Sequence, residues 1–468
     1  MENKAVDTGS AGKRPAVFFG KVRDKLRAKI RGAAESVRTF FRTANSNTFA
    51  SMCFMGAGQL MYKQWAKGLI YLGIEALFIV LMALWGGEAI YGFFTLGLVR
   101  GDPWTGVEGD NSVVMLLMGI LAWFVLIAFV CTYFANIKDC YRTQQDVAAG
   151  KCPAKFLDEA KGLLDKKFYK TVLFLPVVGV LVFNVLPIVF MIFVAFTDYG
   201  GETVPPELVS WVELDNFEKL VALADIADSF FKILGWNILW AVLSTFINYF
   251  LGLGLALLLN KKCVKGKAFW RAFPVLAYAV PGFITLLGFK FMLSYGGPIN
   301  QLIIEHGGEA IGFLGRDAKW MARFIGIAVN AWMSVPTTML LATGILSNMN
   351  TDLYEAARID GAGAWKQFTR ITLPFVVFST TPVLISQFIS NFNNFGIFYF
   401  LRGGLTLDGY FEASDTDLLI NWLYNLSIDN NYYSIGAAIS LVIFVITSVI
   451  SLAVYVRSSA YKREDMFR

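Results

Sequence analysis

Three asparagines lie inside an apolar stretch in the last third of the chain. Asn391, Asn393 and Asn394 fall in the segment 373–398, which consists mainly of apolar residues. A side-chain amide both donates and accepts hydrogen bonds without carrying charge, which suits a ligand rich in hydroxyl groups. Unpaired amides are unfavourable in an apolar environment, so these side chains are expected to line a cavity or to pair with one another. Hydrogen bonding between helices, with no ligand, is the open alternative.

Aromatic residues in neighbouring apolar segments add a second feature. Tyr278, Trp332 and Phe392 each present a ring that can cover the apolar face of a pyranose. Amides and aromatic rings together predict a binding surface for an uncharged sugar.

Residues for covalent catalysis are missing from the sequence. His306 is the single histidine and falls in a polar segment without a matched nucleophile or set of metal ligands. No G-x-x-x-x-G-K-[ST] sequence occurs to bind nucleotide phosphates, and the five cysteines match no zinc spacing. We therefore expect no catalytic residue, no metal site and no enzymatic activity in this chain.

Residues 352–371 predict two short helices joined by a glycine turn. Asp352 and Glu355 have the spacing of a capping box, and Gly361 and Gly363 supply positions where φ can be positive. The first helix would present a small apolar face, which favours a protein partner because the segment is otherwise surrounded by polar residues. This face consists of Leu353, Ala356, Ala357 and Ile359.

Composition shows which elements must position these residues. The 468 residues are 56% hydrophobic and only 16% charged, a balance too apolar for a soluble protein of this length. About 20 apolar residues suffice for a helix to cross a bilayer, and we predict eight such spans in an all-α polytopic membrane protein. The predicted spans are 69–94, 113–137, 172–196, 236–259, 272–293, 324–346, 373–398 and 435–456.

The positions of Lys and Arg predict the orientation of these spans. Most of the 41 basic residues fall in alternate connecting segments, beginning with the N-terminal tail. Basic residues near span ends are retained on the cytoplasmic side, so both termini are predicted to be cytoplasmic. The net charge of +6 arises from residues beside the spans, which favours contact with lipid headgroups and not with nucleic acid.

We divide the chain into three parts. Residues 1–68 form a basic tail and an interfacial segment, residues 69–168 a two-helix membrane extension, and residues 169–468 a six-helix body. The predicted hairpin at 352–371 belongs to the body.

The hairpin resembles the cytoplasmic signature of permease subunits of ABC importers. That signature is Glu-Ala-Ala, three residues, Gly, nine residues, Ile, one residue and Leu-Pro. It is matched by Glu355, Ala356, Ala357, Gly361, Ile371, Leu373 and Pro374. The resemblance implies that the hairpin docks on an ATPase subunit through Glu355, Ala356, Ala357, Asp360 and Gly361.

Residues 170–460 resemble the larger membrane subunit of the maltose and maltodextrin importers within that family. The stretches 278–284, 329–332 and 390–395 carry this likeness. The resemblance implies a substrate pocket lined by Tyr278, Gly282, Asn330, Ser334, Gln387, Asn391, Asn394 and Gly396. The implied partners are a second permease, two ATPase subunits that bind ATP and Mg, and an extracellular sugar-binding protein, all at a bacterial cytoplasmic membrane.

An ion-coupled secondary sugar transporter is the alternative. Such a protein needs ionisable residues within the membrane for proton or sodium coupling. Only Glu75, Glu88 and Lys290 qualify by position, and none lies in the amide-rich spans.

Overall fold

The computed structural model describes residues 31–457, apart from residues 33, 34, 36, 37, 103, 105, 154, 155 and 262. Residues 1–30 of the predicted basic tail therefore lie outside the described residues. Every regular element in the described part is helical, and the only strand-like pairings there are isolated bridges, so the all-α prediction is confirmed.

The described residues contain seven helices long and apolar enough to cross a membrane. An eighth span is obtained if the bent pair Lys267–Ala279 and Gly282–Met292 counts as one. Each of the eight predicted spans overlaps one of these segments, and the boundaries differ by five residues or fewer at most ends and by at most 12, at residue 224. The predicted location of both termini remains a prediction.

The chain divides into two compact units, which we describe separately. The first comprises residues 1–96 and 112–188, the second residues 97–111 and 189–468. The boundaries at residues 68 and 168 that we drew from the sequence remain a prediction.

The first unit contains a close antiparallel pair of membrane segments, Trp65–Thr95 and Ser112–Ala148. Gly119 allows this packing because a Cβ there would lie 2.4 Å from Cβ of Phe93, and the rings of Phe78 and Phe129 stack at 3.7 Å. Its helices are α2 (Ser46–Cys53), α3 (Ala57–Met61), α4 (Trp65–Leu81), α5 (Gly87–Thr95), α6 (Ser112–Ala148), α7 (Phe156–Leu164) and α8 (Phe168–Val180), while α9 (Leu186–Val194) crosses the boundary between units.

The small-residue segment before the first span is a tight turn in this unit. Gly56 has φ of +85° and its N–H donates to Oδ1 of the buried Asn136. The Met55 N–H donates to Glu75 at 2.9 Å, which gives this membrane carboxylate a structural partner.

The second unit is a bundle built on the long parallel contact between α11 and α15. Its core contains Trp236 and Trp240 of α11 together with Phe398 of α19, and the contacts among these rings bring α19 against this pair. Its helices are α10 (Asp215–Ala222), α11 (Ala224–Asn260), α12 (Lys267–Ala279), α13 (Gly282–Met292), α14 (Pro298–Glu305), α15 (Lys319–Ser347), α16 (Asp352–Ile359), α17 (Ala364–Gln367), α18 (Leu373–Phe392), α19 (Gly396–Arg402), α20 (Leu419–Tyr424) and α21 (Tyr433–Arg457).

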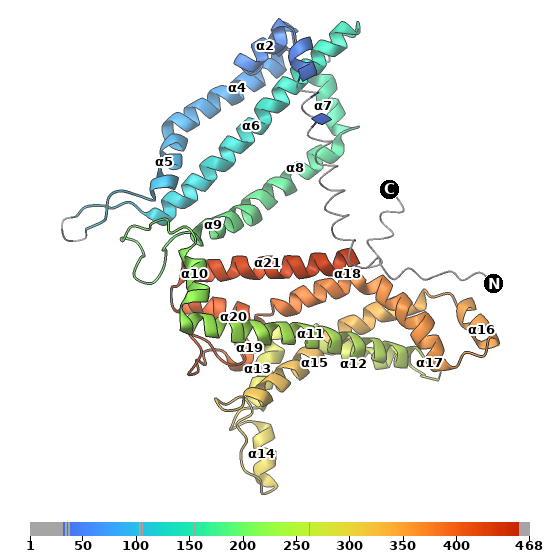
Figure 1. Cartoon of the computed structure of the whole chain (residues 1–468). Helices are drawn as coiled ribbons and strands as arrows, with labels where there is room; N and C mark the ends of the chain where they lie inside the picture. Colours follow the sequence, from blue (N-terminus) through green and yellow to red (C-terminus); the bar gives the residue numbers. More distant parts are fainter. Residues whose placement is uncertain are drawn as a thin grey trace, which may run out of the picture. The chain divides into compact units, whose positions relative to one another are not determined.

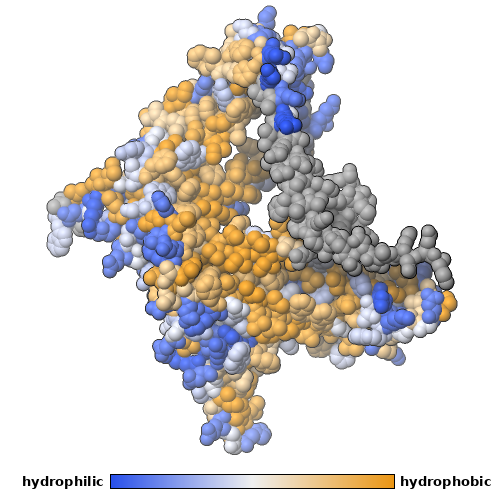
Figure 2. Space-filling model, in the orientation of Figure 1, coloured by the Kyte–Doolittle hydropathy of each residue, from blue (hydrophilic) through white to orange (hydrophobic). Residues whose placement is uncertain are grey.

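The two ends of this bundle differ in structure. The hairpin α16–α17 lies at one end, which we call the hairpin end, and α19 and α20 lie toward the other, which we call the loop end (Figure 1). Hydrophobic residues cover the middle of α11 and α21, and hydrophilic residues gather toward both ends (Figure 2). This distribution is the one expected of a bundle that crosses a membrane.

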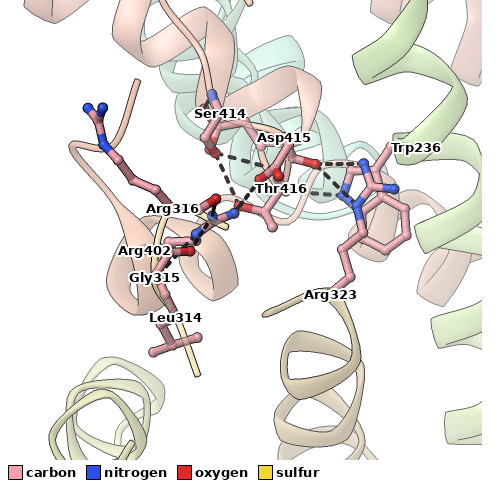
Figure 3. A network of polar contacts seen from close by, with 10 residues as sticks. Trp236, Leu314, Gly315, Arg316, Arg323, Arg402, Ser414, Asp415 and Thr416 are labelled. Carbon is pink, nitrogen blue, oxygen red and sulfur yellow. Dashed lines mark hydrogen bonds and ion pairs between the residues drawn. The ribbon is translucent and has the colours of Figure 1, made fainter. Parts of the chain in front are cut away.

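A buried arginine joins three chain segments at the loop end (Figure 3). Arg402, only 4% exposed, ends α19 and forms an ion pair with Asp415. Its Nη2 donates to the carbonyl oxygens of Gly315 at 2.7 Å and Arg316 at 3.0 Å. Because residues 312–316 and 403–418 are separate loops, Arg402 fixes both against the end of α19.

A second buried arginine extends this network to α11. Arg323 on α15 donates from Nε and Nη2 to the backbone oxygen of Asp415, at 3.1 and 2.6 Å. Its guanidinium lies 4.0 Å from the ring centroid of Trp236, and the Trp236 indole N–H donates to the Thr416 carbonyl at 3.0 Å. The loop 403–418 is thus held by α11, α15 and α19 together.

Candidate functional site

A cavity of about 440 Å³ lies among α11, α12, α13, α15, α18 and α19. All eight residues that the sequence predicted for a substrate pocket line it: Tyr278, Gly282, Asn330, Ser334, Gln387, Asn391, Asn394 and Gly396. The remaining lining residues are Asn248, Ala277, Val280, Phe283, Leu286, Met333, Thr337, Ser390, Ile397 and Phe400. The structure thus brings the predicted residues together, while their part in binding remains a prediction.

One wall of the cavity is a broken membrane helix. α12 ends at Ala279 and α13 begins at Gly282, with a bend of 90° between them. Pro281 at the break has no N–H to continue the α12 hydrogen-bond ladder. The first N–H groups of α13, those of Gly282 and Phe283, have no intrahelical acceptor and border the cavity. Tyr278 reaches the same space from the last turn of α12.

A chain of amides forms another part of the lining. Asn330 on α15 donates from Nδ2 to Oδ1 of Asn391 on α18 at 3.3 Å, and Asn391 donates to the Thr245 hydroxyl at 3.0 Å. The Asn391 carbonyl oxygen also accepts the Trp240 indole N–H at 3.0 Å. These contacts hold α11, α15 and α18 in register, so the asparagines have structural roles as well as access to the cavity.

A second helix break lies at the end of α18. This helix ends at Phe392 and α19 begins at Gly396. Asn394, which lies in the break, accepts the Ile397 N–H through Oδ1 at 3.2 Å and so caps α19. Asn393, which we expected beside the other two asparagines, is exposed and donates to the Ile389 carbonyl away from the cavity.

Two cavity amides keep an acceptor without a partner among the described residues. These atoms are Oε1 of Gln387 and Oδ1 of Asn248, and both are buried. Nε2 of Gln387 donates to the Thr338 hydroxyl at 3.0 Å, which fixes the orientation of this amide. A buried acceptor left unpaired is unfavourable by about 1–3 kcal/mol, and a ligand hydroxyl can satisfy it.

The sequence reading missed Asn248 and misplaced two aromatic residues. Asn248 is an amide within the apolar span 236–259, which is the same signal that pointed to Asn391, so the sequence could have predicted it. Trp332 is 58% exposed on α15 and Phe392 is buried in the core, so neither borders the cavity. Helical register decides this, because it turns these two rings away from the face that carries Asn330 and Asn391. The aromatic lining residues are Tyr278, Phe283 and Phe400.

The cavity lining contains no Asp, Glu, Lys, Arg or His. A charged ligand would therefore meet no counter-charge from the described residues that line the cavity. Uncharged amides, hydroxyls and rings suit a neutral ligand that donates and accepts hydrogen bonds.

The predicted hairpin is a separate feature at the hairpin end. α16 and α17 are joined by a turn in which Gly361 has φ of +74°, as expected, whereas Gly363 has φ of −66°. The predicted capping box is wrong: Asp352 is the first helical residue, and the Asn350 side chain accepts its N–H at 2.9 Å. Ile359 is 88% exposed and lies on the predicted apolar face.

Comparison with known proteins places these features in a family. Residues 248–460 match the family model described as binding-protein-dependent transport system inner membrane component. The galactooligosaccharides transport system permease protein GanP of Bacillus subtilis (strain 168) is 33% identical over 413 residues, which cover 87% of this chain and 96% of the relative. The maltodextrin transport system permease protein MalC of Streptococcus pneumoniae serotype 4 is 32% identical over 422 residues, covering 88% and 95%.

The fold also resembles a solved transporter. The crystal structure of a bacterial ABC transporter involved in the import of the acidic polysaccharide alginate contains a chain with a TM-score of 0.52 and 22% identity. The match covers 63% of this chain and 96% of that chain.

A multi-pass helical bundle with broken spans around a polar cavity defines the class as a membrane transport subunit. The chain belongs to the family of binding-protein-dependent transport system inner membrane components and is one of its permease subunits.

Proposed function

We propose that this chain forms half of the translocation pathway for a maltodextrin, or a closely related neutral oligosaccharide, in an ATP-driven importer. One observation carries the proposal, namely the uncharged cavity in which Gln387 and Asn248 keep buried acceptors without a partner in the described part of the chain. The names of the relatives, which refer to maltodextrin and galactooligosaccharides, support an oligosaccharide as the substrate class.

The cavity supplies the contacts that a sugar requires. Hydroxyls of the sugar would donate to Gln387 Oε1 and Asn248 Oδ1 and accept from the Asn394 amide, whose Nδ2 remains after Oδ1 caps α19. The rings of Tyr278 and Phe400 would cover the apolar faces of the pyranose.

Partner subunits complete the proposed machine. ATP and Mg would bind to two ATPase subunits, and the hairpin would receive their movement through Glu355, Ala356, Ala357, Asp360 and Gly361. A second permease would form the other half of the pathway, and an extracellular binding protein would deliver the sugar at the loop end. In this arrangement both termini face the cytoplasm of a bacterial cell, and this chain holds no nucleotide.

An ion-coupled sugar transporter receives less support. Its coupling residue would have to border the substrate, yet the described lining of the cavity contains no Asp, Glu, Lys, Arg or His. Glu75 lies in the first unit, where it accepts the Met55 N–H.

Uptake of labelled maltotriose tests the substrate directly. Cells lacking the gene should lose uptake, and a plasmid copy should restore it. Excess unlabelled maltotetraose should compete, and a charged oligosaccharide of equal length should not. Unchanged uptake in the deletion strain would contradict the maltodextrin assignment, and collapse of uptake by a protonophore while ATP is maintained would favour ion coupling.

A further inference from the structure

We propose that a groove between the loop-end halves of α11 and α15 binds the phosphate headgroup of an anionic phospholipid. This inference requires only that the chain spans a membrane, so it stands apart from the proposed sugar. The groove has a volume of about 380 Å³ and is separate from the polar cavity. It is lined by Phe231, Lys232, Gly235, Trp236, Leu239, Lys319, Arg323 and Tyr410.

Arg323 gives the groove a fixed cation. Its side chain is only 9% exposed, and two of its nitrogens donate to the Asp415 carbonyl while the guanidinium lies over Trp236. Nη1 has no partner among the described residues. Because the guanidinium is held by Trp236 and Asp415, little conformational freedom is lost when Nη1 binds a phosphate oxygen.

Two lysines add positive charge at the same level. Lys232 pairs with Asp228 at 2.5 Å and lies 5.3 Å from the ring centroid of Tyr410, while Lys319 forms no ion pair within the described part of the chain. The groove lining contains no carboxylate. The nearby Asp415 carboxylate is paired with Arg402 and Asp228 is paired with Lys232, so the positive excess that faces the groove comes from Arg323 and Lys319.

The position of the groove favours a lipid. Lys232 and Arg323 lie just before the apolar windows 236–259 and 324–346, at the level where phosphate headgroups meet the hydrocarbon. Tryptophan and basic residues are typical of this interface, and Trp236 and Trp320 lie beside these cations.

An apolar surface continues from the groove along α11. Its exposed side chains are Ile238, Leu239, Val242, Phe246 and Phe250. Figure 2 shows a hydrophobic band over the middle of α11, in agreement with these exposures. Acyl chains can lie on this surface while the headgroup occupies the groove. An acidic protein partner would need no apolar surface beside the groove, so this surface favours a lipid.

Native mass spectrometry of the purified transport complex tests the site. Delipidated complex is titrated with phosphatidylglycerol, with phosphatidylcholine of the same acyl chains, and with soluble glycerol 3-phosphate. We expect phosphatidylglycerol to bind most tightly. Each lysine near an anionic headgroup contributes a factor of about five, so K232Q/K319Q should lower the affinity for phosphatidylglycerol about 25-fold.

The control variant K219Q removes a lysine from a similar surface pair. Lys219 forms an i,i+4 ion pair with Asp215 at 2.7 Å, as Lys232 does with Asp228, but it does not line the groove. This variant should bind phosphatidylglycerol like wild type. Equal binding of the two lipids, or unchanged binding by K232Q/K319Q, would overturn the proposal. Equal affinity for phosphatidylglycerol and for soluble glycerol 3-phosphate would also overturn the proposal. The same holds if the lysine variants bind phosphatidylglycerol normally and lose only the stimulation of transport by the binding protein.

Discussion

Individual amides serve two purposes in this cavity. Asn330 and Asn391 are almost fully buried and bonded to each other, so they join helices as polar residues in membrane bundles commonly do. Gln387 differs, because one half of its amide is bonded to Thr338 and the other half is unpaired. A buried acceptor without a partner lowers stability, and this makes it the clearest candidate for a ligand contact.

Gln387→Leu tests this role. The substitution removes the unpaired acceptor together with the Nε2 bond to Thr338, and because these two effects oppose each other thermal stability should change little. The apparent KM for sugar uptake should rise about tenfold for one lost hydrogen bond. The measurement is uptake kinetics together with thermal unfolding of the purified complex.

Ser244→Ala is the matched control for Gln387→Leu. The Ser244 hydroxyl is also buried and unpaired in the described structure, but it does not line the cavity. This variant should leave the KM unchanged. If both variants raise the KM equally, the effect is one of packing, and Gln387 does not contact the sugar.

Interruptions in helices shape this protein at the scale of elements. The breaks at Pro281 and at residues 393–395 open backbone groups and side chains toward the cavity, where irregular backbone is tolerated within a membrane. The hairpin is a third interruption, and there a single glycine allows the chain to reverse. In each case the break lies beside a group proposed to bind a ligand or a partner.

Gly361→Ala and Gly363→Ala form a matched pair at the hairpin. A Cβ at either position meets no atom within 4 Å, so the two variants differ only in backbone conformation. Alanine at φ of +74° is unfavourable by about 1–2 kcal/mol, whereas alanine at φ of −66° is not strained. We expect Gly361→Ala to lower co-purification of the ATPase subunit about five- to thirtyfold. Equal effects of the two variants would rule out the turn conformation as the cause.

Arg402→Met tests whether the buried ion pair holds the loop end. Removing one partner of a buried pair destabilises by about 3–5 kcal/mol, because Asp415 is left as an uncompensated charge. Thermal unfolding of the complex measures the loss, and Arg402→Met/Asp415→Asn should lose less than Arg402→Met alone. The exposed pair of Arg100 and Glu207 is the control: Glu207→Gln should cost less than about 1 kcal/mol. A similar loss from both pairs would contradict the role of burial.

The uncharged cavity lies in the bundle of the second unit, whose hairpin end and loop end differ in chemistry. Exposed apolar residues at the hairpin end suit docking, whereas the loop end is held by a buried charged network in which Arg402 and Asp415 are central. Asp417 belongs to the same end and accepts the backbone N–H and the hydroxyl of Ser414, both at 2.8 Å. Burial nevertheless raises the pKa of Asp417 to about 6.

Stability of the whole molecule should therefore depend on pH. The folded state holds the Asp417 proton up to about pH 6, whereas an unfolded Asp releases it near its ordinary pKa of 3.8. The contribution of proton binding at Asp417 to the free energy of unfolding is present in full below about pH 4 and is lost as the pH rises to about 6. Asp417→Asn stays neutral, so it should remove this decline and unfold at a higher temperature than wild type at pH 7.

Thermal unfolding of purified protein between pH 4 and 7.5 checks this prediction. Asp360→Asn, at an exposed position on the hairpin, should keep the wild-type pH dependence. A decline that persists unchanged in Asp417→Asn would show that another group causes it.

The sequence by itself determined the membrane class, the approximate spans and the hairpin, and its resemblance to the maltose permease subunits supplied the eight residues gathered around the cavity. Hydropathy is a local property, so apolar runs locate spans before any packing is known. An amide side chain within such a run needs a hydrogen-bond partner, so it is expected to face the inside of the bundle whatever the fold. The hairpin was predictable because its signature lies within about twenty consecutive residues.

The tertiary structure alone decided the features that depend on distant contacts. Pro274, Pro336 and Pro382 lie inside helices, whereas Pro281 lies at a 90° break, so residue type could not locate the break. Packing around each proline decides whether its missing hydrogen bond is tolerated or bends the chain. Arg402 likewise finds the Gly315 carbonyl 87 residues away, a pairing that only the folded chain creates.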